Sequence, residues 1–237
     1  MARRMILQAF LKALAQLDDP RFRRVLAKGI GITLLVLFGF ATLLVWGSGW
    51  LVGDSLTVPW IGEITWVDNV ISWAMVPVTV VLSIFLMVPV ASAVTGLFLE
   101  DVAQAVEDRH YPHLGQAQTV SFGEAIRDGL GFLGVLALAN IVALVLYLLF
   151  APFAPFIFWG LNGFLLGREY FILAAMRRVG RIEAKRLWRR HIVTVWIGGV
   201  LMALPLSIPL VNLLVPVLGA ATFTHVFHRL TAQGPRG

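Results

Sequence analysis

The chain has 237 residues, of which 59% are hydrophobic and 14% are charged, and its formal net charge is +6. Soluble domains carry about 25% charged residues, so this composition excludes an ordinary water-soluble domain and indicates an integral membrane protein. The basic residues flank apolar blocks and do not alternate with aromatic residues along a stripe, which argues against nucleic acid as a partner.

The N-terminal segment, residues 1–28, is predicted to be an amphipathic helix followed by the approach to the first membrane span. Apolar residues recur there at helical spacing: Ile6, Phe10, Leu14 and Leu17. This spacing favours a helix on the cytoplasmic membrane surface. A signal peptide is the alternative, but Gln8 and Lys12 interrupt its apolar stretch.

Long blocks with few or no charged residues predict the membrane-crossing helices, because a span needs about 20 apolar residues. We expect spans at residues 29–52, 69–93, 129–151 and 156–176. Pro152 and Pro155 mark the turn between the last two, since proline breaks the helical hydrogen-bond ladder. The fold class is therefore an all-α integral membrane protein, with the whole chain, 1–237, as a single membrane domain.

Residues 192–228 are predicted to form a helical hairpin that turns near Pro205 and Pro209. Full crossing and partial penetration of the bilayer both stay open, because prolines interrupt a block that is short for two spans. Two cytoplasmic segments remain, residues 94–128 and residues 177–191. The second is strongly basic, and we expect it to form a short helix.

Orientation follows from the distribution of Lys and Arg, which favour the cytoplasmic side. The loop at 53–68 and the two proline turns contain neither residue, whereas the other flanks hold every Lys and Arg except Arg168. This pattern predicts that both termini are cytoplasmic, in a multi-pass protein of the bacterial inner membrane.

Residues just before the first span form a candidate anion-binding site. Asp19 can cap a helix that begins at Pro20, and Arg23 and Arg24 add fixed cations near its N-terminus. A helix N-terminus with neighbouring arginines favours an oxyanion. The alternative is that these basic residues serve only to orient the first span.

Arg168 is the one basic residue placed inside a predicted span, and Glu169 follows it directly. Adjacent residues point to different sides of a helix, so the two cannot fully satisfy each other. Arg168 either lines an anion path or belongs to a structural ion pair that locks two helices. Gly163 and Gly167 form a small-xxx-small step that lets a neighbouring helix approach closely.

No catalytic, metal or cofactor motif stands out, and there is no cysteine. His110 with His113, and His225 with His228, have ligand-like spacing, but no third ligand is placed to complete a metal site. No nucleotide-binding glycine loop is present. We therefore expect neither an enzyme nor a cofactor.

Several short stretches, in this order, resemble the CysZ-type sulfate permeases and the wider etoposide-induced-protein-like domain family. They are a Pro-x-x-Arg-Arg approach to the first span, Pro89 to Glu107, the pair Glu169-Tyr170, Ile208 to Pro216, and His228-Arg229-Leu230. The resemblance covers about residues 5–230. It implies an inner-membrane protein that admits sulfate for cysteine synthesis, with hairpins that penetrate part way and with assembly into a homo-oligomer.

In that family, a Gly-Leu-Arg-Arg-like step before the first span binds sulfate, and it carries over here to Phe22, Arg23 and Arg24. Arg21 stands in place of the glycine. The resemblance thus implies transport of sulfate or a related oxyanion through Arg23 and Arg24. The alternative function is a membrane scaffold or assembly factor that binds a partner through residues 94–128 or 177–191.

Overall fold

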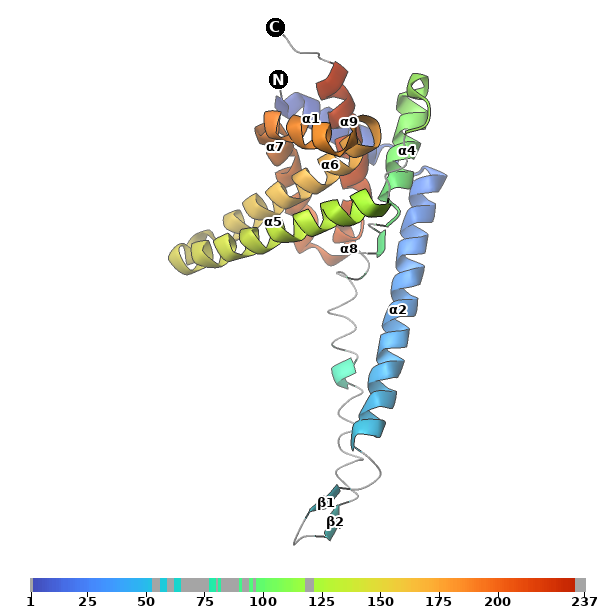
Figure 1. Ribbon diagram of the computed structural model, residues 1–237, viewed down its shortest axis with the longest axis vertical. Coiled ribbons are helices and arrows are strands. Elements are labelled where there is room, and N and C mark those ends of the chain that lie inside the picture. Colours follow the sequence, from blue (N-terminus) through green and yellow to red (C-terminus); the bar gives the residue numbers. More distant parts are fainter. Residues whose placement is uncertain are drawn as a thin grey trace. The chain divides into compact units, whose positions relative to one another are not determined.

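The computed structural model describes residues 2–52, 56–58, 62–64, 77–79, 81, 90, 94–95, 97–117 and 122–232. Its helices are α1 (Ala2–Leu14), α2 (Pro20–Val52), α4 (Leu99–His110), α5 (Phe122–Leu149), α6 (Ala154–Arg190), α7 (Ile192–Ala203), α8 (Pro209–Asn212) and α9 (Val215–Ala232) (Figure 1). Short 3-10 helices are η1 (Pro112–Leu114), η2 (Ala151–Phe153) and η3 (Leu204–Ser207). The prediction of an all-α membrane protein is confirmed.

Among the described residues, two helices are long and apolar enough to cross a membrane, within Pro20–Leu44 of α2 and Leu130–Leu149 of α5, with mean hydropathies of 2.0 and 2.6. A third crossing is possible if α6 and α7, which meet at a bend of 88°, count as one broken span. From Leu130 to Leu149, most of the large apolar side chains of α5 are exposed, as expected of a helix that faces lipid.

The chain forms two compact units, Ala27–Gly96 and Met1–Leu26 together with Leu97–Gly237. In the first unit, strands β1 (Leu56–Val58) and β2 (Gly62–Ile64) form a small antiparallel pair that the sequence analysis did not predict. The predicted span at 69–93 lies outside the described residues, apart from 77–79, 81 and 90.

Helix α9 is the centre of the second unit, where every residue from Val215 to His228 is buried. Helices α1, α4 and α6 all pack against it. Small residues make this close packing possible: a Cβ added at Gly219 would lie 2.3 Å from the ring of Tyr170. The buried face of this helix is mostly apolar, and its buried polar side chains are Thr222, Thr224, His225 and His228.

Helix α1 packs on α9 with a face that agrees only in part with the predicted apolar residues, of which Phe10 and Leu17 pack against the core. Ile6, Ala9 and Ala13 are buried, whereas Leu14 is exposed. The small side chains of Ala9 and Ala13 let α1 approach other helices closely, so this helix contributes to the protein core as well as presenting an apolar face outward.

Helices α5 and α6 form a hairpin whose turn is η2, at the predicted prolines (Figure 1). Helix α6 then continues into the basic residues 177–191, but its helical geometry is interrupted at Gly180, with φ 74° and ψ 170°. Such a positive φ is readily available only to glycine. Gly180 therefore divides α6 into two helical parts, and it lies within the basic stretch, just after Arg177 and Arg178.

After the bend at His191, α7 returns along α6 in close contact with it. A Cβ at Gly199 would lie 1.8 Å from the carbonyl oxygen of Gly163, and one at Gly167 would lie 2.6 Å from that of Val195. The predicted small-xxx-small step at Gly163 and Gly167 is thus confirmed, and its partner is α7.

Candidate functional site

The first turn of α2 carries the predicted anion-binding arginines. Its start is fixed by Asp19, whose Oδ1 accepts the backbone N–H of Arg21 at 2.9 Å and whose Oδ2 accepts the side-chain amide of Gln16 at 3.0 Å. The chain's own carboxylate thus caps this helix, so an external anion has to be held chiefly by side chains.

Arg21, Arg23 and Arg24 have different surroundings although they are neighbours in sequence. Arg21 forms an ion pair with Asp108 and so connects the start of α2 to α4. Arg23 and Arg24 are exposed, and within the described part of the chain neither side chain makes a hydrogen bond or an ion pair. Their guanidinium groups are therefore free to bind a solute anion.

A buried cluster of charged groups lies around Glu107 of α4, whose side chain is only 1% exposed. Arg178 binds both of its carboxylate oxygens, with Nε 3.0 Å from Oε1 and Nη2 2.7 Å from Oε2. His228 of α9 contacts Oε1 through Nε2 at 2.9 Å. The Nη1 of Arg177 lies 3.4 Å from Oε2.

These contacts decide the protonation of Glu107. Burial alone would raise its pKa, but the hydrogen bonds from His228 and Arg178, and the charges of Arg177 and Arg178, outweigh that effect and lower the pKa to about 2. Glu107 is thus an anion at neutral pH. Because its partners lie on α6 and α9, the cluster ties three helices together.

Arg177 and Arg178 of α6 also have partners other than Glu107. Arg178 also donates to the carbonyl oxygens of Leu114 and Gly115 at 3.0 and 2.9 Å, which fixes the chain after α4. The Nη2 of Arg177 donates to Oε1 of Gln104 at 2.5 Å. These arginines are therefore committed to internal partners, in contrast to Arg23 and Arg24.

The predicted histidine pairs do not converge on a metal. Within the described residues no group of three or more His, Cys, Asp or Glu side chains could hold a metal ion. His225 shares a hydrogen bond of 3.0 Å with the hydroxyl of Tyr111, and the ring of Tyr111 lies 4.3 Å from that of His228. These two histidines contribute to the junction of α4 and α9.

Arg168 is buried inside the helical bundle, with 5% of its surface exposed. Its guanidinium carbon lies 5.2 Å from the ring centre of Phe132 and 5.8 Å from that of Trp188. The Glu169 carboxylate is 4.0 Å away, too far for a hydrogen bond. Within the described chain, Nη1 of Arg168 has no hydrogen-bond partner.

The sequence analysis singled out Arg23, Arg24 and the Arg168–Glu169 pair but missed the Glu107 cluster. In the structure the Glu107 cluster joins residues of α4, α6 and α9 that are 71 and 121 positions apart. The only sequence signal was a carboxylate at a position of α4 that faces inward, among Val102, Ala103 and Val106, all of which are buried.

Comparison with known proteins places most of the chain in one family. The family model described as "Sulfate transporter CysZ/Etoposide-induced protein 2.4" matches residues 9–216. Among curated proteins none matches the chain.

Proposed function

We propose that this chain, which belongs to the family of the sulfate transporter CysZ and etoposide-induced protein 2.4, carries sulfate or a related oxyanion across the bacterial inner membrane. The anion would supply sulfur assimilation and cysteine synthesis. The family match and the apolar helices α2 and α5 support a membrane transport protein. Sulfate as the solute rests on the family alone.

The observation that carries the proposal is the difference between Arg21 and its neighbours. Arg21 is neutralised by Asp108, whereas Arg23 and Arg24 expose two adjacent cations without an internal carboxylate among the described residues. Charge-assisted hydrogen bonds from arginine are among the strongest contacts that an oxyanion can receive. We therefore assign the first binding step to Arg23 and Arg24.

Arg21, which replaces the glycine of the family motif, has a structural explanation. Its pair with Asp108 ties the start of α2 to α4, and the buried Phe22 anchors the same turn in the core. The turn that presents Arg23 and Arg24 is thus held by protein contacts. A fixed turn favours anion binding, because less conformational freedom is lost when the ligand binds.

Arg168 is our candidate for a second position along the anion path. A buried cation with an unsatisfied N–H group is costly in a membrane protein and is usually functional. The aromatic rings of Phe132 and Trp188 stabilise the positive charge of Arg168 without neutralising it. We also propose that both termini lie in the cytoplasm and that the protein assembles into a homo-oligomer.

The test is uptake of radiolabelled sulfate into proteoliposomes that contain the purified protein. Replacement of Arg23 and Arg24 by alanine should lower the initial rate at least tenfold, because both cations of the site are removed. Arg3 and Arg4 form a matched control, since they are also adjacent and exposed on a helix. Wild-type uptake by the Arg23→Ala/Arg24→Ala protein would remove these residues from the mechanism.

A further inference from the structure

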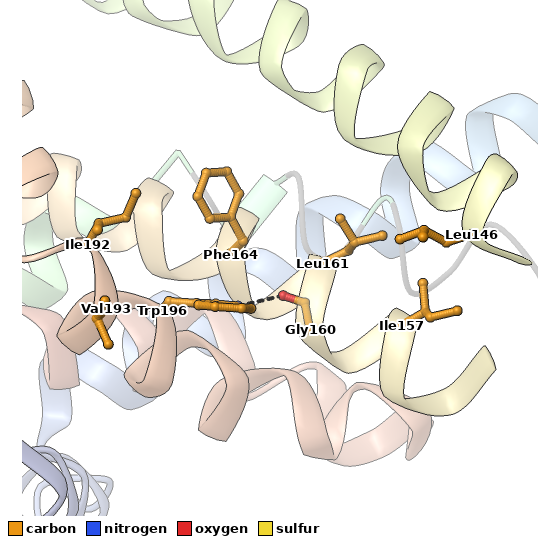
Figure 2. Close-up of a pocket in the computed structure, with 8 residues that line it drawn as sticks. All are labelled: Leu146, Ile157, Gly160, Leu161, Phe164, Ile192, Val193 and Trp196. Atoms are coloured by element: carbon orange, nitrogen blue, oxygen red, sulfur yellow. Dashed lines mark hydrogen bonds between the residues drawn. The ribbon is translucent and has the colours of Figure 1, made fainter. Parts of the chain in front are cut away.

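An apolar groove of about 500 Å³ lies between α5, α6 and α7. Its lining consists of Leu146, Ile157, Gly160, Leu161, Phe164, Ile192, Val193 and Trp196. The indole of Trp196 donates a hydrogen bond of 2.8 Å to the carbonyl oxygen of Gly160, which fixes the ring within the groove (Figure 2). This volume is typical of small-molecule sites, about 300–1,000 Å³.

The groove is elongated and almost entirely apolar. In Figure 2, Ile192 and Val193 lie at one end of the row of side chains, and Leu146 and Ile157 lie at the other. The same helices carry many exposed apolar side chains, such as Leu144 and Leu148 of α5. In a membrane, hydrocarbon chains are the material available to fill such a groove.

Two exposed arginines stand close in sequence to the residues at one end of the groove. Ile192 directly follows His191, and the exposed Arg189 and Arg190 come just before it. Consecutive Cα atoms are about 3.8 Å apart, so both arginines lie within reach of that end. In the described part of the chain the side chain of neither arginine forms a hydrogen bond or an ion pair, whereas Arg186 is paired with Glu183 at 3.5 Å.

A second contact places the basic end of α6 at the groove. Phe164, which lines the groove, packs against Trp188 with ring centres 5.8 Å apart. Trp188 directly precedes Arg189. The arginines are therefore joined to the groove through the turn at His191 and also through this aromatic contact.

We propose that the groove holds one acyl chain of an anionic phospholipid whose phosphate is bound by Arg189 and Arg190. A hydrocarbon slot that ends in two uncompensated cations is complementary to a lipid with an apolar tail and a negative headgroup. Basic clusters beside membrane helices recognise anionic headgroups by the same electrostatic attraction. None of Arg23, Arg24 and Arg168 lines the groove, although Trp188 contacts both Phe164 of the groove and Arg168. The proposed lipid site does not depend on the nature of the transported solute.

The test compares lipids retained by the purified protein, measured by native mass spectrometry after incubation with phosphatidylglycerol or with phosphatidylcholine of the same acyl chains. The wild-type protein should retain phosphatidylglycerol at least fivefold more than phosphatidylcholine. Replacement of Arg189 and Arg190 by glutamine should abolish this preference, whereas the same change at Arg3 and Arg4 should leave it unchanged.

A second variant tests the groove without a change in charge. A Cβ at Gly160 would meet no atom within 4 Å, so leucine fits there and occupies part of the groove. The backbone hydrogen bond to Trp196 is kept. Gly160→Leu should lower phosphatidylglycerol retention at least fivefold at an unchanged melting temperature. Equal retention of the two lipids by the wild-type protein, or unchanged retention in Gly160→Leu, would overturn the proposal.

Discussion

Arg178 and Glu107 form a bidentate ion pair between α6 and α4, with contacts of 3.0 and 2.7 Å, and the Glu107 side chain is 1% exposed. Arg177 and His228 contact the same carboxylate. The single negative charge of the buried carboxylate is therefore shared by two arginines, and the carboxylate holds α9 through the histidine. This arrangement makes Glu107 the most sensitive polar position of the second unit.

Glu107→Gln should destabilise the protein by about 3–5 kcal/mol, because removal of one member of a buried ion pair leaves its partners uncompensated. Melting temperatures in detergent measure this effect. Asp101→Asn is the matched control, since Asp101 lies exposed on the same helix, and it should change stability by less than about 0.5 kcal/mol. Equal melting temperatures for Glu107→Gln and wild type would show that the cluster is not stabilising.

The lowered pKa of Glu107 predicts a dependence of stability on acid pH. The pKa falls from its ordinary value of 4.5 to about 2 in the folded protein, so the stabilisation is fully present above pH 4.5. It is lost as the pH falls from 4.5 toward 2, and it amounts to at most about 3 kcal/mol. Denaturation followed from pH 7 to pH 3 should show the gap between wild type and Glu107→Gln becoming smaller. A gap that stays constant over this range would contradict the assignment.

The contact between α6 and α7 should not tolerate a side chain at Gly199. A Cβ there would lie 1.8 Å from the carbonyl oxygen of Gly163, so α7 would have to move away from α6. We expect Gly199→Ala to lower stability by about 1–3 kcal/mol. Gly160→Ala, where the added Cβ meets nothing within 4 Å, is the control and should be neutral or slightly stabilising. The same melting temperature in both variants would be inconsistent with this packing.

The two interpretations of Arg168 predict different behaviour of variants. If Arg168 lines the anion path, Arg168→Gln should lower sulfate uptake at least tenfold, whereas Arg168→Lys, which keeps the charge, should retain more of the rate. If it serves only to lock helices, both variants should lose stability while the folded fraction transports at the wild-type rate. Uptake per folded protein, measured beside the melting temperature, separates the two.

The sequence predicted those features that depend on local pattern. The predicted turn falls at η2, which contains Pro152, while Pro155 lies in the first turn of α6, and the Gly163–Gly167 step is in contact with α7. These features could be predicted because proline geometry and small-residue spacing act over a few residues. The buried position of Arg168 could be anticipated for the same reason, since it interrupts an apolar segment.

The sequence could not reveal features set by tertiary packing. Glu107 resembles its exposed neighbour Asp108, and only the approach of α6 and α9 distinguishes the two carboxylates. Leu14 follows the helical period of Ile6 and Phe10, yet it is exposed because α9 contacts the neighbouring face of α1. The role of Arg21 became evident only from its pairing with Asp108.

The central claim is that this protein moves an oxyanion through the membrane. The most direct measurement is the rate of radiolabelled sulfate uptake by proteoliposomes of the wild-type protein, with unlabelled sulfate, sulfite, phosphate or chloride as competitor. We predict saturable uptake that sulfate inhibits and that the same concentration of chloride does not. Uptake no faster than in protein-free liposomes would contradict the claim.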